Sequence, residues 1–198
     1  MNIQFEWCKG GFRISKVVSN DPALILPSHH LLMPVIEIGK NALAGCQIEM
    51  VRLPKKTMVI REGAFAGCKK LEGVIAFNDL MFIEDDAFSE CRALTKVDFS
   101  YCPLVTVGAR AFKGCGALES VELPDSVNDV GPEAFFGCRK LKQFRNPSSN
   151  RVVETETFGH SGLEEIDGLD GVEVRENAFA DTPFERRSVN HDVCSTAG

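Results

Sequence analysis

The sequence of 198 residues lacks any run of about 18 apolar residues, so neither a transmembrane helix nor membrane insertion is expected. Its first segment, MNIQFEWCKGG, has no basic region followed by an apolar stretch, and therefore predicts no signal peptide. From the sequence as it stands we expect a cytoplasmic protein. If an export signal was trimmed from it, we expect a cell-surface protein instead.

Excess positive charge is also missing. The chain has 22 Lys and Arg residues against 28 Asp and Glu residues, which gives a formal net charge of −6. Because a phosphate-binding surface needs clustered Lys and Arg, nucleic acid is not an expected partner.

Motifs of common cofactor and metal sites are absent as well. The sequence has neither a GxGxxG nor a GxxxxGKS/T loop to hold a nucleotide. No CxxC pair occurs, and the four histidines share no spacing with the cysteines. We therefore expect no cofactor and no metal ion. The hydrophobic content of 44% is that of a globular protein.

What the sequence does contain is a repeat. An apolar pair built on Ala-Phe returns about every 23 residues, and Ile or Val stands five residues before each copy. Self-similarity at such a period indicates a solenoid, a propeller or an array. The second residue of the pair is found at Leu43, Phe65, Phe88, Phe112, Phe135, Phe158 and Phe179.

Each repeat divides into three segments, most clearly within residues 107–124. The first has apolar side chains at Val107, Ala111, Phe112 and Cys115, which is the spacing of one helical face. The second, Leu-x-x-Val-x-Leu-Pro, alternates as a short strand does and ends at proline. A polar turn then leads to the next Ile or Val. We therefore expect a parallel strand and a short helix or 3₁₀ turn in each repeat.

The strand pattern matches the Leu-x-x-Leu-x-Leu signature of leucine-rich repeats. With the segment Ile-Gly-x-x-Ala-Phe-x-Gly-Cys, nearly complete at 38–46 and 107–115, the chain resembles the BspA-like, or treponemal-type, leucine-rich-repeat family over about residues 24–184. The resemblance implies an α/β fold, a right-handed leucine-rich-repeat solenoid. It also implies an adhesin-like role, since families of this type are usually exported surface proteins. The Asn ladder of other leucine-rich repeats is missing.

We expect a single leucine-rich-repeat domain over residues 1–198. Residues 1–34 are the expected N-terminal cap, because 3–7 and 12–17 flank Lys9-Gly10-Gly11 as in a β-hairpin. About seven repeats follow over 35–184, and 185–198 form a polar C-terminal tail with a possible last strand at 188–190.

The cysteines invite a chemical interpretation. Five of the eight follow the repeat, and because free cysteine is among the most buried residue types we expect these five in the core. Cys8, Cys102 and Cys194 lie outside the repeat and are expected to be more accessible to solvent, which leaves a thiol-dependent enzyme as an alternative. No base and orienting group accompany them in a recognisable pattern, so we expect a non-enzymatic protein. The repeating set is Cys46, Cys68, Cys91, Cys115 and Cys138.

The surface is where a binding function is predicted. Two residues of each strand face outward, and parallel stacking places equivalent residues about 4.8 Å apart. We predict a module that presents this strand face to a protein or an extended peptide; an intracellular regulatory or structural scaffold is the alternative. The predicted partner-binding residues are Arg52, Ile75, Asp98, Glu122, Arg145 and Asp167 in one row, flanked by Lys96 and Gln143.

Overall fold

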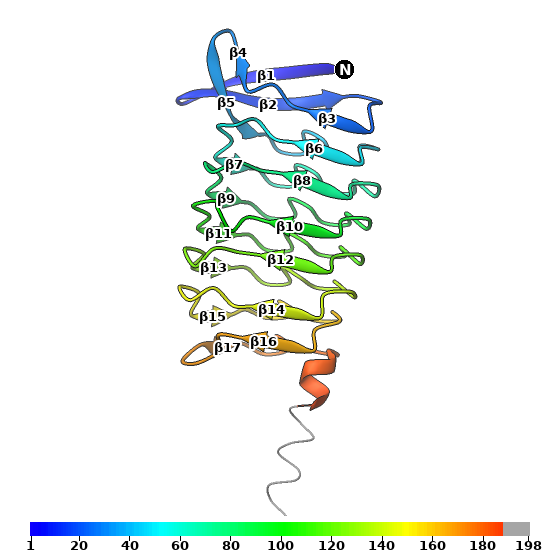
Figure 1. Ribbon diagram of the computed structural model, residues 1–198, viewed down its shortest axis with the longest axis vertical. Coiled ribbons are helices and arrows are strands. Elements are labelled where there is room, and N and C mark those ends of the chain that lie inside the picture. Colours follow the sequence, from blue (N-terminus) through cyan, green and yellow to red (C-terminus); the bar gives the residue numbers. More distant parts are fainter. Residues whose placement is uncertain (188–198) are drawn as a thin grey trace, which may run out of the picture.

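Each repeat contributes two short strands to the computed structural model, which describes residues 1–187 (Figure 1). Equivalent strands of successive repeats stack on one another, so the chain winds as a solenoid along one long axis. The solenoid predicted from the repeat is therefore confirmed. The predicted strand at 188–190 and Cys194 lie outside the described residues.

The strands predicted from the Leu-x-x-Val-x-Leu pattern form the first row, in which all pairs are parallel. Five of them make one sheet, and the last two pair with each other. The middle residue of each strand points inward, as Val97 and Val121 do, because side chains alternate along a strand. The row comprises β3 (Ala23–Ile25), β6 (Met50–Arg52), β8 (Gly73–Ile75), β10 (Lys96–Asp98), β12 (Ser120–Glu122), β14 (Gln143–Arg145) and β16 (Glu165–Asp167).

A second row of strands was not predicted. The Ile or Val expected at the start of a helix is instead the last residue of a very short parallel strand, and it is buried in every repeat except the last, where Val174 is exposed. The row comprises β5 (Met33–Ile38), β7 (Val59–Ile60), β9 (Phe82–Ile83), β11 (Thr106–Val107), β13 (Asp129–Val130), β15 (Val152–Val153) and β17 (Glu173–Val174).

The predicted hairpin cap is present. Strands β1 (Asn2–Cys8) and β2 (Gly11–Val18) pair antiparallel, and β2 continues the second row by pairing parallel with β5. The short strand β4 (His29–His30) pairs antiparallel with the start of β5. The hairpin thus covers the apolar end of the first repeat, which would otherwise be an open edge (Figure 1).

The helix or 3₁₀ turn expected in each repeat is instead a run of reverse turns. Two residues per repeat adopt a left-handed backbone, for example Arg110 at φ 55° and Gly114 at φ 74°, and such residues interrupt a right-handed helix. Along these turns, the backbone N–H groups therefore donate alternately within their own repeat and to the next repeat. Lys113 donates within its own repeat, to Arg110, whereas Phe112 and Gly114 donate to carbonyl oxygens of the next repeat, both at 2.8 Å. Within the described residues, one helical turn at 183–187 follows the last repeat.

The phenylalanines of the repeat form one continuous stack in the core. Phe88, Phe112 and Phe135 lie face to face with ring centroids 5.3 and 5.5 Å apart and interplanar angles of 6° and 3°. All three side chains are completely buried. The stack extends to Phe65 at one end and, through Phe158, to Phe179 at the other. The repeating pair is therefore a packing element, as expected.

The cysteine thiols join successive repeats without disulfides. Sγ of Cys115 donates a hydrogen bond to the carbonyl oxygen of Phe88 in the preceding repeat at 3.2 Å. Cys68, Cys91 and Cys138 make the equivalent bond at 3.0, 3.2 and 3.3 Å. These four cysteines are buried free thiols, which confirms the core interpretation, whereas Cys46 in the first repeat is partly exposed.

A buried carboxylate ties the cap to the first repeats. Glu37 in β5 is 8% exposed and accepts hydrogen bonds from Nε of Arg13 in β2 and from Nη2 of Arg61 after β7, both at 2.7 Å. Arg61 also pairs with Glu84 of the following repeat at 2.6 Å. Burial acts to raise the pKa of Glu37, but the hydrogen bonds from Arg61 and Arg13 outweigh it and hold that pKa below its usual value of 4.5.

This network predicts an acid-sensitive contribution to stability. Because the pKa of Glu37 is lower in the folded than in the unfolded protein, its contribution is present above the unfolded pKa and is lost as pH falls through the folded pKa. Glu37→Gln is expected to lower the urea midpoint at pH 7 and to approach the native protein as the pH falls through the folded pKa of Glu37. Glu6→Gln is the control, since that exposed carboxylate lies 3.9 Å from the same Arg13. Parallel midpoint profiles for the native protein and the Glu37 variant would contradict the prediction.

Candidate functional site

The candidate site is the outward side of the first row of strands, which we call the strand face. The first and third residues of each strand project from it, and the register pairs Arg52 with Ile75, and Asp98 with Glu122. All eight predicted residues lie on this face, in strands β6 to β16. Their role in binding stays a prediction.

Chemical character changes along the strand face. At its N-terminal end three apolar side chains are exposed: Ile25 in β3 by 67%, Met50 in β6 by 38% and Ile75 in β8 by 48%. From β10 onward the projecting residues are mostly charged. Ile25 continues the predicted outer row, but it was not among the predicted partner-binding residues because residues 1–34 were assigned to the cap. The Leu24-Ile25-Leu26-Pro27 pattern already carried that signal.

A shallow hollow lies on the strand face around Gly73, which has no side chain to fill it. Met50, Lys96 and Asp98 are among the residues that line the hollow. The carboxylate of Asp98 accepts hydrogen bonds from the hydroxyl and the backbone N–H of Ser100 at 2.7 and 3.1 Å, and these bonds lower its pKa. Asp98 therefore remains an anion at neutral pH.

A second hollow lies where the strand ladder is interrupted, between β12 and β14. Glu122, Gln143, Arg145 and Asp167 are among its lining residues, so the structure brings four predicted residues together. The guanidinium of Arg145 is directed to Asp125, at 2.7 Å. Within residues 1–187, neither Asp98 nor Glu122 takes part in an ion pair, which leaves an acidic centre on the face.

The two proposed reactive thiols that lie within the described residues, Cys8 and Cys102, are not activated. Cys102 was expected to be accessible, but this is wrong: it is buried, because its thiol packs inward and donates to the carbonyl oxygen of Phe77 at 3.3 Å. Burial raises the pKa of Cys102 and also that of Cys8, whereas an activated nucleophile needs a lowered pKa.

Neither a metal site nor a membrane-spanning helix is found among the described residues. Over the described part of the chain, no group of three or more His, Cys, Asp or Glu residues is placed to hold a metal ion. Among residues 1–187, no helix is both long and apolar enough to cross a membrane.

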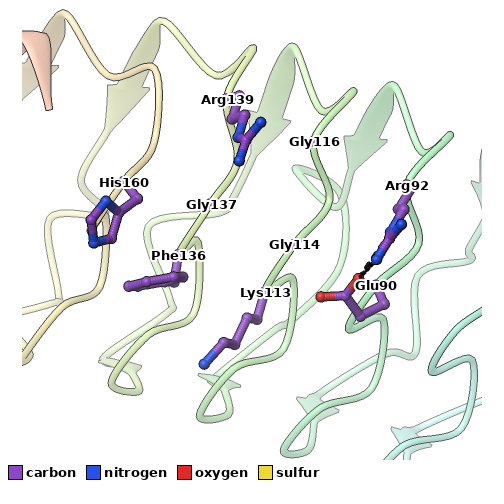
Figure 2. Close-up of a pocket in the computed structure, with 9 residues that line it drawn as sticks. All are labelled: Glu90, Arg92, Lys113, Gly114, Gly116, Phe136, Gly137, Arg139 and His160. Carbon is purple, nitrogen blue, oxygen red and sulfur yellow. Dashed lines mark hydrogen bonds and ion pairs between the residues drawn. The ribbon is translucent and has the colours of Figure 1, made fainter. Parts of the chain in front are cut away.

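A pocket that sequence analysis did not predict lies in the turn segments of the middle repeats (Figure 2). Its lining includes Lys113, Phe136 and Arg139, none of which belongs to the strand face. Lys113 and Phe136 directly follow a core phenylalanine, a position that holds Ala44 and Ala66 in the first two repeats. This departure from the repeat is the feature of the sequence that could have indicated the pocket.

Three solved structures are similar to the chain. A leucine-rich repeat protein of T. pallidum is 29% identical with a TM-score of 0.84, and the match covers 96% of this chain and 92% of that protein. A leucine-rich repeat protein of Bacteroides ovatus is 25% identical with a TM-score of 0.58, covering 91% and 55%. The pneumococcal vaccine antigen PcpA is 18% identical with a TM-score of 0.67, covering 89% and 49%, and shows the fold alone. No curated protein matches the chain.

The family comparison agrees with the repeat geometry. The family described as the BspA type leucine rich repeat region matches residues 36–164 in six copies, which is more than half of the chain. Proteins of this repeat type and solenoid fold are typically non-enzymatic. The chain belongs to the BspA-type leucine-rich repeat family.

Proposed function

We propose that this chain is a non-enzymatic binding module that presents its strand face to a protein or an extended peptide. The observation that carries the proposal is the contrast between the two sides of each strand. Inward positions repeat the same kinds of apolar residue, as the fold requires, whereas the outer row changes from Ile25 through Asp98 to Arg145. Packing does not dictate these outward residues, which leaves them available for recognition.

The strand face also suggests the character of its partner. Exposed Ile25, Met50 and Ile75 provide an apolar end, and a partner is expected to cover them with apolar side chains. Near the centre, Asp98 and Glu122 are acidic residues that form no ion pair within residues 1–187, and they favour a basic group on the partner. The strand face spans seven stacked strands, which is long enough for an extended peptide or one protein epitope.

We further propose an adhesin-like role at a cell surface. The membership of the BspA-type family supports this role. The test is to find where the protein resides in intact cells, by protease accessibility before and after lysis. Protection of the protein until lysis would contradict a surface role.

The strand face is tested by reversing its acidic centre. We expect Asp98→Lys with Glu122→Lys to weaken partner binding at least about tenfold, because two anions facing a basic group become two cations. The thermal midpoint should change little, since both side chains are exposed. Binding is measured by affinity capture with the domain as bait, followed by titration of the captured partner.

The matched control is Asp170→Lys with Glu176→Lys. It changes the net charge by the same amount at two exposed positions off the strand face. Retained binding in this control and loss in the Asp98/Glu122 variant would support the proposal. Equal affinity of both variants and the native protein would place the binding surface elsewhere.

A further inference from the structure

The pocket in the turn segments is lined by side chains whose identities are not dictated by packing of the core. Its volume is about 540 Å³, within the usual size of small-molecule sites. Gly114, Gly116 and Gly137 form its floor, and side chains from four successive repeats rise around them (Figure 2). The side chains are those of Glu90, Arg92, Lys113, Phe136, Arg139 and His160.

Two of these side chains occupy costly backbone positions. Glu90 and His160 have φ of 59° and 54°, at a position where four other repeats have glycine. A non-glycine residue is disfavoured in this left-handed region, because its Cβ atom comes too close to the following carbonyl oxygen. The two residues stand at opposite ends of the pocket (Figure 2). Side chains therefore replace glycine at the two ends of the pocket, while glycine remains on its floor.

One positively charged side chain of the pocket forms no ion pair within the described residues. Arg92 is paired with Glu90 at 2.8 Å, and the ammonium group of Lys113 is paired with Glu133. Arg139 is exposed, and within the described part of the chain no carboxylate forms an ion pair with it. The pocket thus offers one free guanidinium in a protein whose net charge is −6.

An aromatic side chain lines the same pocket as this cation. The ring of Phe136 is held by the ammonium group of Lys113, 4.8 Å from its centroid, and by the imidazole of His160, whose centroid is 5.0 Å away at an angle of 66°. An aromatic ring fixed on two sides is a pre-organised surface for an apolar group. The pocket thus combines one aromatic side chain with charged groups, most of which are already paired.

We propose that this pocket binds a carboxylate joined to a small apolar body, supplied by a free organic acid or by the C-terminus of a peptide. The guanidinium of Arg139 presents paired N–H donors that match the two oxygens of a carboxylate. A single unbalanced positive charge favours a monoanion, because a phosphate dianion would leave one negative charge uncompensated. The site is separate from the strand face and does not depend on the proposed function.

The probe is N-acetylphenylalanine, compared with its amide, which has the same ring and no carboxylate. Binding is followed by chemical-shift changes in ¹H–¹⁵N spectra of the full chain. We expect saturable binding of the acid with a dissociation constant of about 0.1–1 mM. The amide should bind at least about tenfold more weakly.

Three variants locate the site. Arg139→Gln should weaken binding about 10- to 100-fold, the range for a charge-assisted pair. Lys140→Gln removes the same charge one residue away, from a side chain that pairs with Glu119 at 3.0 Å, and should leave binding unchanged. Gly116→Leu should block the pocket without unfolding the chain, because nothing lies within 4 Å of a Cβ atom at that position.

Equal binding of the acid and its amide would overturn the proposal, as would equal losses in the Arg139 and Lys140 variants. Undiminished binding to a folded Gly116→Leu variant would also overturn it. Benzoate and a short peptide with a free C-terminus distinguish the two sources: tighter peptide binding assigns the site to peptide C-termini, and equal binding assigns it to small acids. The Asp98/Glu122 variant should bind the probe normally, so the two proposals fail separately.

Discussion

Replacing Phe112 with alanine is expected to lower the free energy of unfolding by about 3–5 kcal/mol, the range for a buried aromatic residue. The side chain is completely buried and stacks on Phe88 and Phe135 at 5.3 and 5.5 Å. Its loss leaves a cavity in the middle of the array, where each repeat is stabilised by its two neighbours. The repeats on both sides of the cavity therefore lose their stacking contacts with this ring.

The effect is measured by urea unfolding followed by circular dichroism. Phe82→Ala is the matched control, since this phenylalanine of β9 is 37% exposed, and we expect a much smaller cost for it. A cost below about 1 kcal/mol for Phe112→Ala would contradict the role of the stack.

Alkylation of Cys115 and Cys138 is expected to be at least about 10³-fold slower than that of a cysteine in a peptide. Burial raises the pKa of Cys115 to about 12, so its thiolate fraction at pH 7 is about 10⁻⁵, against about 3% for a free thiol of pKa 8.5. Burial also raises the pKa of Cys138 well above its usual value, and it excludes the reagent from both thiols. Reaction should then require opening of the solenoid.

The order of labelling is read by mass spectrometry of peptides after timed alkylation, with and without urea. Cys8 and Cys46 are partly exposed and should react first. Labelling of Cys115 at the rate of Cys8 in the folded protein would show that the core is open. Labelling of Cys8 faster than a peptide cysteine, with loss of an activity, would favour the thiol-enzyme alternative.

The repeat made much of this fold predictable, and the errors have a physical cause. The strand pattern located β6 to β16 because a three-residue strand still shows one inward and two outward side chains. The two-residue strands of the second row are too short to alternate, so they left no such pattern. The helix was predicted because the spacing of Val107, Ala111, Phe112 and Cys115 also fits stacked turns.

Left-handed positions were only partly readable from the sequence. Before the cysteine, four repeats have glycine, which is a residue typical of a left-handed backbone, and Gly45, Gly67, Gly114 and Gly137 all adopt one. The second left-handed position precedes Ala-Phe and holds Asp86, Arg110 or Glu133 as readily as Gly63. These side chains give no sign of a positive φ, so the break in the helix was hidden.

The candidate sites differ in how far they were predictable. The outer row of the strand face follows directly from the strand register, and all eight residues lie where the sequence placed them. The pocket depends on side chains that depart from the repeat in four different turns, and their convergence is a property of the stacking rather than of any one motif.

The alternating hydrogen bonds of the turn segments give the solenoid a direction. At the core phenylalanine and the residue before the cysteine position, the N–H of one repeat donates to a carbonyl oxygen of the following repeat, as from Phe158 to Ala178. The peptide dipoles on that side therefore add along the axis, with donors left over at the C-terminal end, as at the N-terminus of a helix. There the carboxylate of Glu185 accepts the N–H of Asp181 at 2.9 Å, in place of the carbonyl that a further repeat would supply. Glu185 therefore caps this donor at the C-terminal end of the stack.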